Sequence, residues 1–254
     1  MKNKKNIYFE NLLSDFETVS LKDMDTVQLM DRVDKKFAFN ISKLEHLLHT
    51  LINSYSVLKV NDKAIQTYKS LYFDTEDRVF FLNHHNGRVN RHKVRFREYV
   101  GSGLVFLEVK FKNNKGKTSK SRIKVDCIES ILSNKSKKYV FDNLGKSMNL
   151  LPQQFINFDR ITFVDNFLSE RLTIDFNLSF SKKSDLGSFE NIVIAEIKSE
   201  RSSSSSIFQK LAKEQGIFPI RLSKYCLSTI KLESNIKYNR FKEKLLFVNK
   251  LNKQ

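Results

Sequence analysis

Charged and apolar side chains alternate in five separate segments of this chain, and in each segment the charged set is mainly basic. Successive side chains on a β-strand point to opposite faces, so residues two apart share a face. A single strand of this kind is typical of a sheet with one solvated face, but five with the same bias predict a surface that holds many negative charges. The segments are 93–97 (KVRFR), 108–112 (EVKFK), 120–124 (KSRIK), 171–175 (RLTID) and 196–198 (EIK).

Glycines separate the strand-like runs and indicate that three of the strands are consecutive. The chain has only 7 Gly, and Gly87, Gly101, Gly103 and Gly116 lie between such runs, as residues of hairpin turns do. An antiparallel meander is therefore expected over 91–100, 104–113 and 118–125. Further strands are expected at 34–40, 64–73, 157–163, 170–180 and 190–198. About eight strands suit a closed barrel whose interior is filled with side chains.

Apolar residues at helical spacing lie between the expected strands. Ser42 is a good N-cap for a helix over 43–53, and the five serines at 202–206 predict a flexible loop. Further helices are expected to begin at 127–132 and to span 206–215 and 223–232, with a basic helix or tail over 235–254. No repeat or change in composition divides the chain. We therefore expect one α+β domain over 1–254, with a core at about 12–232, in which helices cover the outside of the barrel.

This arrangement predicts where the charges lie. If helices cover the apolar faces of the strands, the charged faces point into the barrel, where charges carry a desolvation cost unless they are paired or bind a ligand. The chain has 45 Lys and Arg against 28 Asp and Glu, a formal net charge of +17. An excess of this size indicates a polyanionic partner, and the strand pattern predicts that the partner binds inside the barrel.

Nucleic acid is the commonest polyanion, but the sequence argues against it. There is no Trp, and the 22 Phe and 8 Tyr have the spacing of core residues instead of forming a stacking surface. No RNP-like, GxxG or zinc-knuckle motif is present. The absence of GxxxxGK also excludes a P-loop NTPase. We therefore expect no nucleic-acid partner.

The cysteines and the hydropathy pattern predict a cytoplasmic protein. Cys127 and Cys226 lie far apart without metal-binding spacing, which is typical of free thiols in a reducing compartment. The basic N-terminus is not followed by an apolar stretch, so no signal peptide is expected. No segment approaches the roughly 20 apolar residues that cross a bilayer, so no membrane segment is expected.

Eight short motifs follow one another in an order that is fairly specific as a set. They are 31–37 (DRVDKKF), 72–75 (YFDT), 91–99 (RHKVRFREY), 106–110 (FLEVK), 158–160 (FDR), 171–175 (RLTID), 195–198 (AEIK) and 223–225 (SKY). Together they resemble the VTC domain, the catalytic domain of the vacuolar transporter chaperone polyphosphate polymerases and of their stand-alone bacterial relatives. The resemblance runs from about Leu12 to Tyr225 and is to a branch of the triphosphate tunnel (CYTH-like) superfamily.

The resemblance implies an antiparallel barrel with a bore lined by Lys, Arg and a few carboxylates. It implies a reaction in which the γ-phosphoryl group of ATP is transferred to a growing polyphosphate chain, with Mn²⁺ or Mg²⁺ as the cofactor. ATP and polyphosphate are therefore the expected partners. Phosphoryl transfer requires positioning and stabilisation of charge on phosphate oxygens, which basic strand faces supply.

The motifs also imply roles for individual residues. Arg95 and Arg97 match the pair that grips phosphates, and Glu196 matches the metal-binding carboxylate. Glu108, and after it Asp175, is expected to be an auxiliary metal ligand or an ion-pair partner. The expected catalytic residues are Lys36, Arg95, Arg97, Lys110, Arg160, Arg171 and Lys198. The expected substrate-binding residues are Lys93, Lys120, Arg122 and Lys224.

Two positions depart from the family pattern. Phe37 and Phe158 stand where the family usually has Tyr, so two phenol donors are missing, which we expect to tune binding without abolishing activity. Tyr72 and Asp74 belong to the pattern and are expected to be structural, with Asp74 orienting an Arg of the bore.

Two other functions stay open at the level of the sequence. A hydrolase on the same scaffold would cleave inorganic or organic triphosphates, but such relatives begin with an ExExK strand, whereas residues 32–36 read RVDKK. The added positive charge favours holding a long anionic product, so the polymerase is preferred. A non-catalytic binder of polyphosphate, inositol phosphate or nucleic acid would keep the cations without needing Glu196, whose presence argues against that function.

Overall fold

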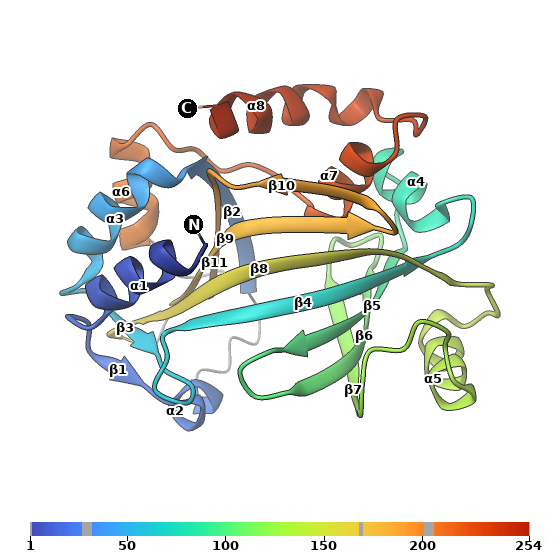
Figure 1. The fold of residues 1–254 in the computed structure, drawn as a ribbon, viewed down its shortest axis with the longest axis horizontal. Helices are drawn as coiled ribbons and strands as arrows, with labels where there is room; N and C mark the ends of the chain where they lie inside the picture. The colour runs from blue at the N-terminus through green and yellow to red at the C-terminus, as the bar shows by residue number, and fades with distance from the viewer. Residues whose placement is uncertain (1, 27–31, 168–169, 201–205, 254) are drawn as a thin grey trace.

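The computed structural model of the chain describes residues 2–26, 32–167, 170–200 and 206–253. They form an α+β fold on one 11-stranded sheet (Figure 1), whose main path runs β2-β11-β9-β8-β4-β5-β6-β7. The strands are β1 (Thr18–Val19), β2 (Arg32–Asn40), β3 (Tyr55–Leu58), β4 (Ile65–Asp74), β5 (Arg91–Tyr99), β6 (Leu104–Lys112), β7 (Thr118–Val125), β8 (Leu151–Asp165), β9 (Glu170–Lys182), β10 (Asp185–Phe189) and β11 (Ile192–Glu200).

The eight strands predicted from the alternation are all confirmed, and together they make the main path of the sheet. The residues at 91–100, 104–113 and 118–125 form β5, β6 and β7, which pair in sequence as an antiparallel meander. β1, β3 and β10 were outside the prediction. β3 has the sequence YSVL and is buried along its whole length, so it lacks the alternation that marks a strand with one solvated face.

Serine N-caps begin two of the helices where the sequence predicts them. Ser206 accepts a hydrogen bond from Gln209 N at the start of α6, and Ser223 accepts one from Cys226 N at the start of α7. Residues 202–205 of the predicted serine loop lie outside the described residues. The helices are α1 (Lys2–Leu13), α2 (Leu21–Thr26), α3 (Leu44–Leu51), α4 (Val79–His85), α5 (Asn134–Leu144), α6 (Ile207–Glu214), α7 (Lys224–Leu232) and α8 (Lys242–Lys253), with 3-10 turns η1 (Ile41–Lys43) and η2 (Asn239–Phe241).

Two helix starts differ from the sequence prediction. Asn40, rather than Ser42, caps the turn before α3, because its side chain accepts a hydrogen bond from Ser42 N. Residues 127–132 are not helical. The Glu129 carboxylate there accepts from the backbone and hydroxyl of Ser133, so the helix begins one residue after Ser133, which caps it.

Helices cover most of the apolar surface of the sheet. α1, α3 and α6 pack in one core with strand residues such as Phe37 and Ile197, and α5 packs on β5 and β6 through Val140 and Leu144. α7 differs, because it lies against the charged face, where Tyr225 stacks on Tyr72 of β4 with ring centroids 5.0 Å apart. The prediction that helices lie outside is therefore wrong for α7.

The sheet is not closed into the predicted barrel. Across the described ranges, no hydrogen-bonded ladder joins β7 to β2, the two ends of the main path. The edge of β2 instead contacts the segment before α7, where Ile220 N donates to Lys36 O (2.7 Å) and Phe37 forms a β-bridge with Pro219. Proline has no N–H with which to continue a ladder, so the pairing stops there.

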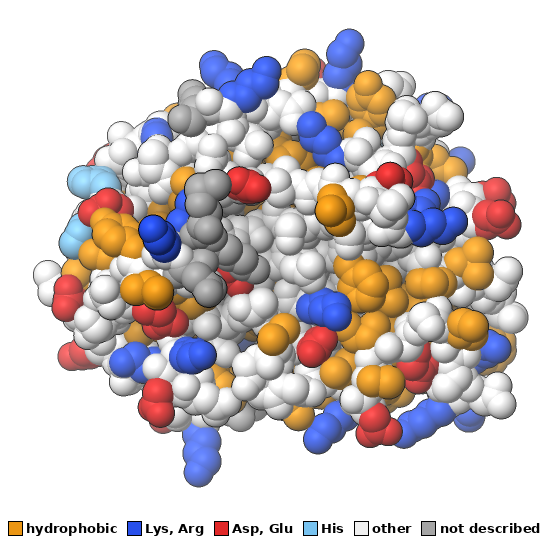
Figure 2. Space-filling model, viewed as in Figure 1, with side chains coloured by type: hydrophobic (Ala, Val, Ile, Leu, Met, Phe, Trp, Pro, Cys, Tyr) orange, Lys and Arg blue, Asp and Glu red, His pale blue; other side chains and the backbone are white. Residues whose placement is uncertain are grey.

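The sheet is nevertheless strongly curved. β2 and β5 stand far apart in the strand order, yet the short segment that begins α7 reaches both, because Ile220 N donates to Lys36 O and Ser223 Oγ accepts from Lys93 Nζ. Basic residues on the face shown in Figure 2 lie mostly near its margin, and hydrophobic side chains gather over the side where β4 and α5 lie. No helix in the described part of the chain is both long and apolar enough to cross a membrane.

Candidate active site

One face of the curved sheet gathers the cations that the sequence singles out. The register puts Lys36 opposite Glu196, Arg95 opposite Glu108, and Arg160 opposite Asp175, so these pairs share that face. We call this face the basic groove. Its cations are Lys36 (β2), Lys93, Arg95 and Arg97 (β5), Lys110 (β6), Lys120 and Arg122 (β7), Arg160 (β8), Arg171 (β9) and Lys198 (β11).

The first ion-pair cluster of the basic groove is centred on Glu196. Lys36 forms an ion pair with Glu196 Oε1, and Lys198 Nζ lies 3.2 Å from the same oxygen. Lys198 also lies 3.4 Å from Asp34 Oδ2 on the neighbouring strand. Burial alone would raise the pKa of Glu196, but Lys198 and Lys36 outweigh it and hold the pKa well below its usual range. Glu196 is therefore charged throughout the physiological pH range.

The second cluster is centred on Glu108, which is only 2% exposed. Arg95 Nε donates to Glu108 Oε2 (2.7 Å), and Lys120 Nζ lies 2.5 Å from Oε1. Burial would raise the pKa of Glu108, but Arg95, Arg97 and Lys120 together lower it. A buried carboxylate stays charged only when it is paired in this way.

The third cluster joins the sheet to α7. Arg160 grips Asp175 with two hydrogen bonds, Nε to Oδ1 (2.5 Å) and Nη2 to Oδ2 (2.7 Å), and Lys224 at the start of α7 forms an ion pair with Oδ2. Burial of Asp175 is outweighed by Arg160 and Lys224, which lower its pKa to about 2. The N-terminus of α7 adds a partial positive charge at this point.

Three further cations of the basic groove have no carboxylate within ion-pair distance in the described part of the chain. Lys93 Nζ donates to Ser223 Oγ (2.9 Å). Arg97 is 7% exposed and lies over the rings of Tyr68 and Phe158, 5.2 and 5.7 Å from their centroids. Lys110 is the third, and the register places it between Lys93 on β5 and Lys120 on β7. The basic groove therefore carries positive charge that the protein itself does not neutralise.

The pKa values of two lysines reflect this crowding of like charge. Desolvation by the surrounding protein, together with repulsion from Lys93, Lys36 and Lys198, lowers the pKa of Lys110 to about 7, although Glu196 opposes the shift. Burial also lowers the pKa of Lys120, to about 8, despite its contact with Glu108. Near neutral pH the Lys110 amine is therefore only partly protonated, whereas Lys120 is mostly protonated, and an approaching anion would favour the charged form of both.

Two predicted residues lie apart from the three clusters. The Arg122 guanidinium sits over the Phe106 ring, 4.7 Å from its centroid. Arg171 Nη2 donates to the backbone oxygen of Met24 (3.4 Å), beside α2. The remaining predicted cations lie in the clusters or between them.

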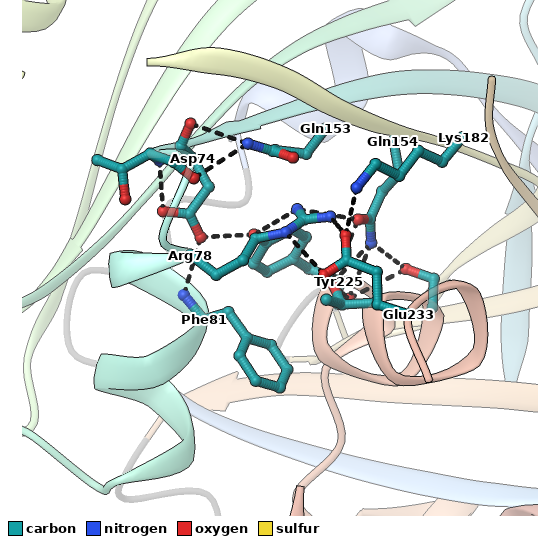
Figure 3. Close-up of polar contacts among 11 residues, drawn as sticks. Asp74, Arg78, Phe81, Gln153, Gln154, Lys182, Tyr225 and Glu233 are labelled. Carbon is teal, nitrogen blue, oxygen red and sulfur yellow. Dashed lines mark hydrogen bonds and ion pairs between the residues drawn. The ribbon is translucent and has the colours of Figure 1, made fainter. Parts of the chain in front are cut away.

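Tyr72 makes a polar contact that its predicted structural role did not include, whereas Asp74 keeps a structural role without the expected contact to an Arg of the bore. The Tyr72 hydroxyl accepts a hydrogen bond from Arg95 Nη1 (2.7 Å), so this side chain belongs to the basic groove. Asp74 contacts no Arg of the basic groove. It accepts instead from the Tyr225 hydroxyl (2.6 Å) and from the amides of Phe80 and Phe81 in α4, as Figure 3 shows in part.

The sequence contained one indication of where the Tyr72 side chain points: Tyr68 and Tyr72 are four residues apart, so on a strand they share a face. That spacing does not indicate which strand pairs with β4. The pairing Tyr72↔Arg95 places the phenol among the cations.

The sequence profile of the VTC domain matches residues 31–233. The chain belongs to the VTC domain family. Among solved structures, this VTC domain is similar to a Hippeastrum protein described as having a dominant triphosphatase activity, at 16% identity and a TM-score of 0.48 over 83% of this chain and 100% of that one. It is also similar to a conserved hypothetical protein of Pyrococcus furiosus, at 16% identity and a TM-score of 0.42 over 77% and 99% of the two chains. No curated protein matches it.

The residues of this VTC domain fit a divalent metal at one place. No three His, Cys, Asp or Glu side chains of the described residues converge as a complete metal site, but Mg²⁺ at phosphate sites often takes only one or two carboxylates and binds phosphates and water otherwise. Both Lys36 and Lys198 approach Glu196 through Oε1, which leaves Oε2 for a metal ion. Glu108 fits less well, because cations contact both of its oxygens.

Proposed function

We propose that this VTC domain is a metal-dependent polyphosphate polymerase that transfers the γ-phosphoryl group of ATP to a polyphosphate chain lying in the basic groove. The observation that carries the proposal is that Lys93, Arg97 and Lys110, beside three acid-centred ion-pair clusters, have no carboxylate of the described residues within ion-pair distance. A phosphate chain would supply the missing negative charge along the whole basic groove. A single phosphate would reach only part of it.

Each group of residues has a role that follows from its position. Arg95 and Arg97 bind phosphate oxygens through planar N–H forks, while Lys36, Lys110, Lys198 and Lys224 act as point charges on the same chain. Arg160, fixed by its two bonds to Asp175, offers its remaining N–H groups to the substrate. These groups stabilise the charge that spreads over the transferred phosphoryl oxygens and hold donor and acceptor in line.

Mn²⁺ or Mg²⁺ would be held by Glu196 together with phosphate oxygens. The ion would neutralise charge on the β- and γ-phosphates when bound. The protein side chains would remain responsible for orientation, because a single carboxylate would hold the ion to the chain. Lys36 and Lys198 keep that carboxylate charged and in place.

The test is incubation of the purified protein with γ-labelled ATP and Mn²⁺, with the products separated on a gel. A ladder of long polyphosphate is expected. Arg97→Ala should lower the rate on the order of a hundredfold, since the loss of a phosphate contact at the transition state costs a few kcal/mol. Arg88→Ala, which alters an exposed arginine outside the basic groove, is the matched control and should keep the wild-type rate.

A triphosphatase is the second candidate, favoured by one observation. Asp34 of β2 and Glu196 both contact Lys198, so a second carboxylate lies one lysine away from Glu196. In the same assay this activity would give free phosphate or triphosphate without a ladder. Unchanged ATP would instead indicate a binding protein without catalysis.

A further inference from the structure

The hydroxyl proton of Tyr72 has no acceptor among the residues that the structure describes. Tyr72 is 7% exposed, and the one hydrogen bond of its hydroxyl is accepted from Arg95 Nη1 (2.7 Å). Buried donors are nearly always paired, so a missing acceptor points to a ligand. The phenol borders a small cavity of about 30 Å³, which is lined by Tyr72, Lys93, Arg95, Glu108, Lys110 and Lys120.

Tyr225 fixes the Tyr72 ring from behind. The two rings are stacked with centroids 5.0 Å apart and planes 17° apart. The Tyr225 hydroxyl donates to Asp74 Oδ2 (2.6 Å), and its backbone oxygen accepts from Gln154 Nε2 (3.1 Å). Figure 3 shows Tyr225, at the start of α7, beside Asp74, Arg78 and Gln154. The Tyr72 ring therefore rests on a partner that is held at both its hydroxyl and its backbone.

We propose that Tyr72 donates a hydrogen bond to a phosphate oxygen of the substrate, and that Tyr225 and Asp74 act as positioning residues behind it. The inference rests on the proposed function only in taking a phosphate chain as the ligand. Lysines supply charge with little directional preference, whereas a stacked phenol donates in one fixed direction. Tyr72 thereby sets where along the basic groove a phosphoryl group comes to rest.

Electrostatics support the role of Tyr72 as a donor. Burial would raise the pKa of the phenol, but Arg95, Arg97 and Lys93 outweigh it and lower the pKa overall. A more acidic phenol is a stronger hydrogen-bond donor towards an anionic oxygen. The hydrogen bond that Tyr72 accepts from Arg95 also keeps its own proton turned away from that guanidinium.

The test is metal-free binding of inorganic tripolyphosphate by isothermal titration calorimetry. Tyr72→Phe keeps the stacked ring and removes only the hydroxyl, so the protein should remain folded with a nearly unchanged melting temperature. We expect tripolyphosphate to bind about tenfold more weakly or worse, as is typical when a hydrogen bond to a charged group is lost. Tyr139→Phe, on α5 outside the basic groove, is the matched control and should bind as the wild type does.

A double-mutant cycle tests the positioning role of Tyr225. Tyr225→Phe keeps the ring stack but loses the hydrogen bond to Asp74, so tripolyphosphate should bind roughly threefold more weakly in the wild-type background. In the Tyr72→Phe background the same change should have almost no effect, because coupled residues are not additive. An equal loss in both backgrounds would overturn the positioning role.

The remaining outcomes separate this inference from the proposed function. If the wild-type protein binds tripolyphosphate and Tyr72→Phe binds it equally well, the donor role of Tyr72 is overturned while the proposed function stands. If the wild-type protein does not bind tripolyphosphate at all, both are overturned.

Discussion

Glu108→Gln removes the negative charge from the most buried carboxylate of the three ion-pair clusters while keeping the side-chain volume. Arg95 and Lys120, whose side chains are 20% and 36% exposed, would then repel each other with no carboxylate between them. Removing one partner of a buried pair typically costs about 3–5 kcal/mol. We expect the lower end, about 3 kcal/mol, because Lys120 is exposed enough to turn towards solvent. For a chain of this length, that cost corresponds to a fall of roughly 6–12 °C in melting temperature.

A phosphate chain should reverse much of this loss, because its oxygens replace the missing carboxylate. Thermal denaturation of Glu108→Gln with and without tripolyphosphate measures both effects, and the rise in melting temperature on binding should exceed that of the wild type. Asp142→Asn is the control, since its pair with Lys138 is exposed and should contribute less than about 0.5 kcal/mol.

Two results would refute this reasoning. A melting temperature equal to that of Asp142→Asn would mean that Glu108 does not hold Arg95 and Lys120 together. Loss of metal-dependent turnover without loss of stability would make Glu108 a metal ligand.

Three other predictions concern ligands and protons. Glu196→Gln should lose Mn²⁺-dependent turnover, because the metal-binding carboxylate is gone, and should still bind polyphosphate without metal, because one repulsive anion is gone as well. Turnover rates measure the first effect and calorimetry the second. Retained turnover would remove Glu196 from the metal site. Lys110, with its pKa lowered to about 7, takes up a proton when a phosphate chain binds, so the affinity for tripolyphosphate should fall as the pH rises above about 7. In binding titrations from pH 6 to 9, Lys110→Arg should make that fall smaller. A hundredfold excess of tripolyphosphate over its Kd should stabilise the protein by about 2.7 kcal/mol, whereas monophosphate at equal ionic strength should not; equal thermal shifts would indicate a diffuse surface patch.

The strands of this fold were predictable because each carries its own signal. In β5, the residues Lys93, Arg95 and Arg97 point one way and Val94 and Phe96 the other, and the apolar pair packs in the core that includes α5. That period of two does not depend on any distant residue. The same alternation predicted the basic groove, because the charged sides of neighbouring strands together form one face of the sheet.

Closure of the sheet and the place of α7 depend on contacts between distant parts of the chain. The edge of β2 contacts Pro219, which is more than 180 residues away in sequence. No local sequence pattern predicts that contact. The stacking of Tyr72 on Tyr225 is equally remote. The alternation identified which face of β4 Tyr72 occupies, but its function depends on a strand pairing and a helix position that only the structure supplies.

Three consecutive residues at the start of α7 carry three separate tasks. The Ser223 hydroxyl caps the helix and accepts from Lys93, Lys224 pairs with Asp175, and Tyr225 supports Tyr72. Each residue of an α-helix is turned by about 100° from the one before, so inserting one residue within this tripeptide would swing at least one of the three side chains away from its partner. An insertion here would therefore be more damaging than a conservative substitution of any one of the three residues.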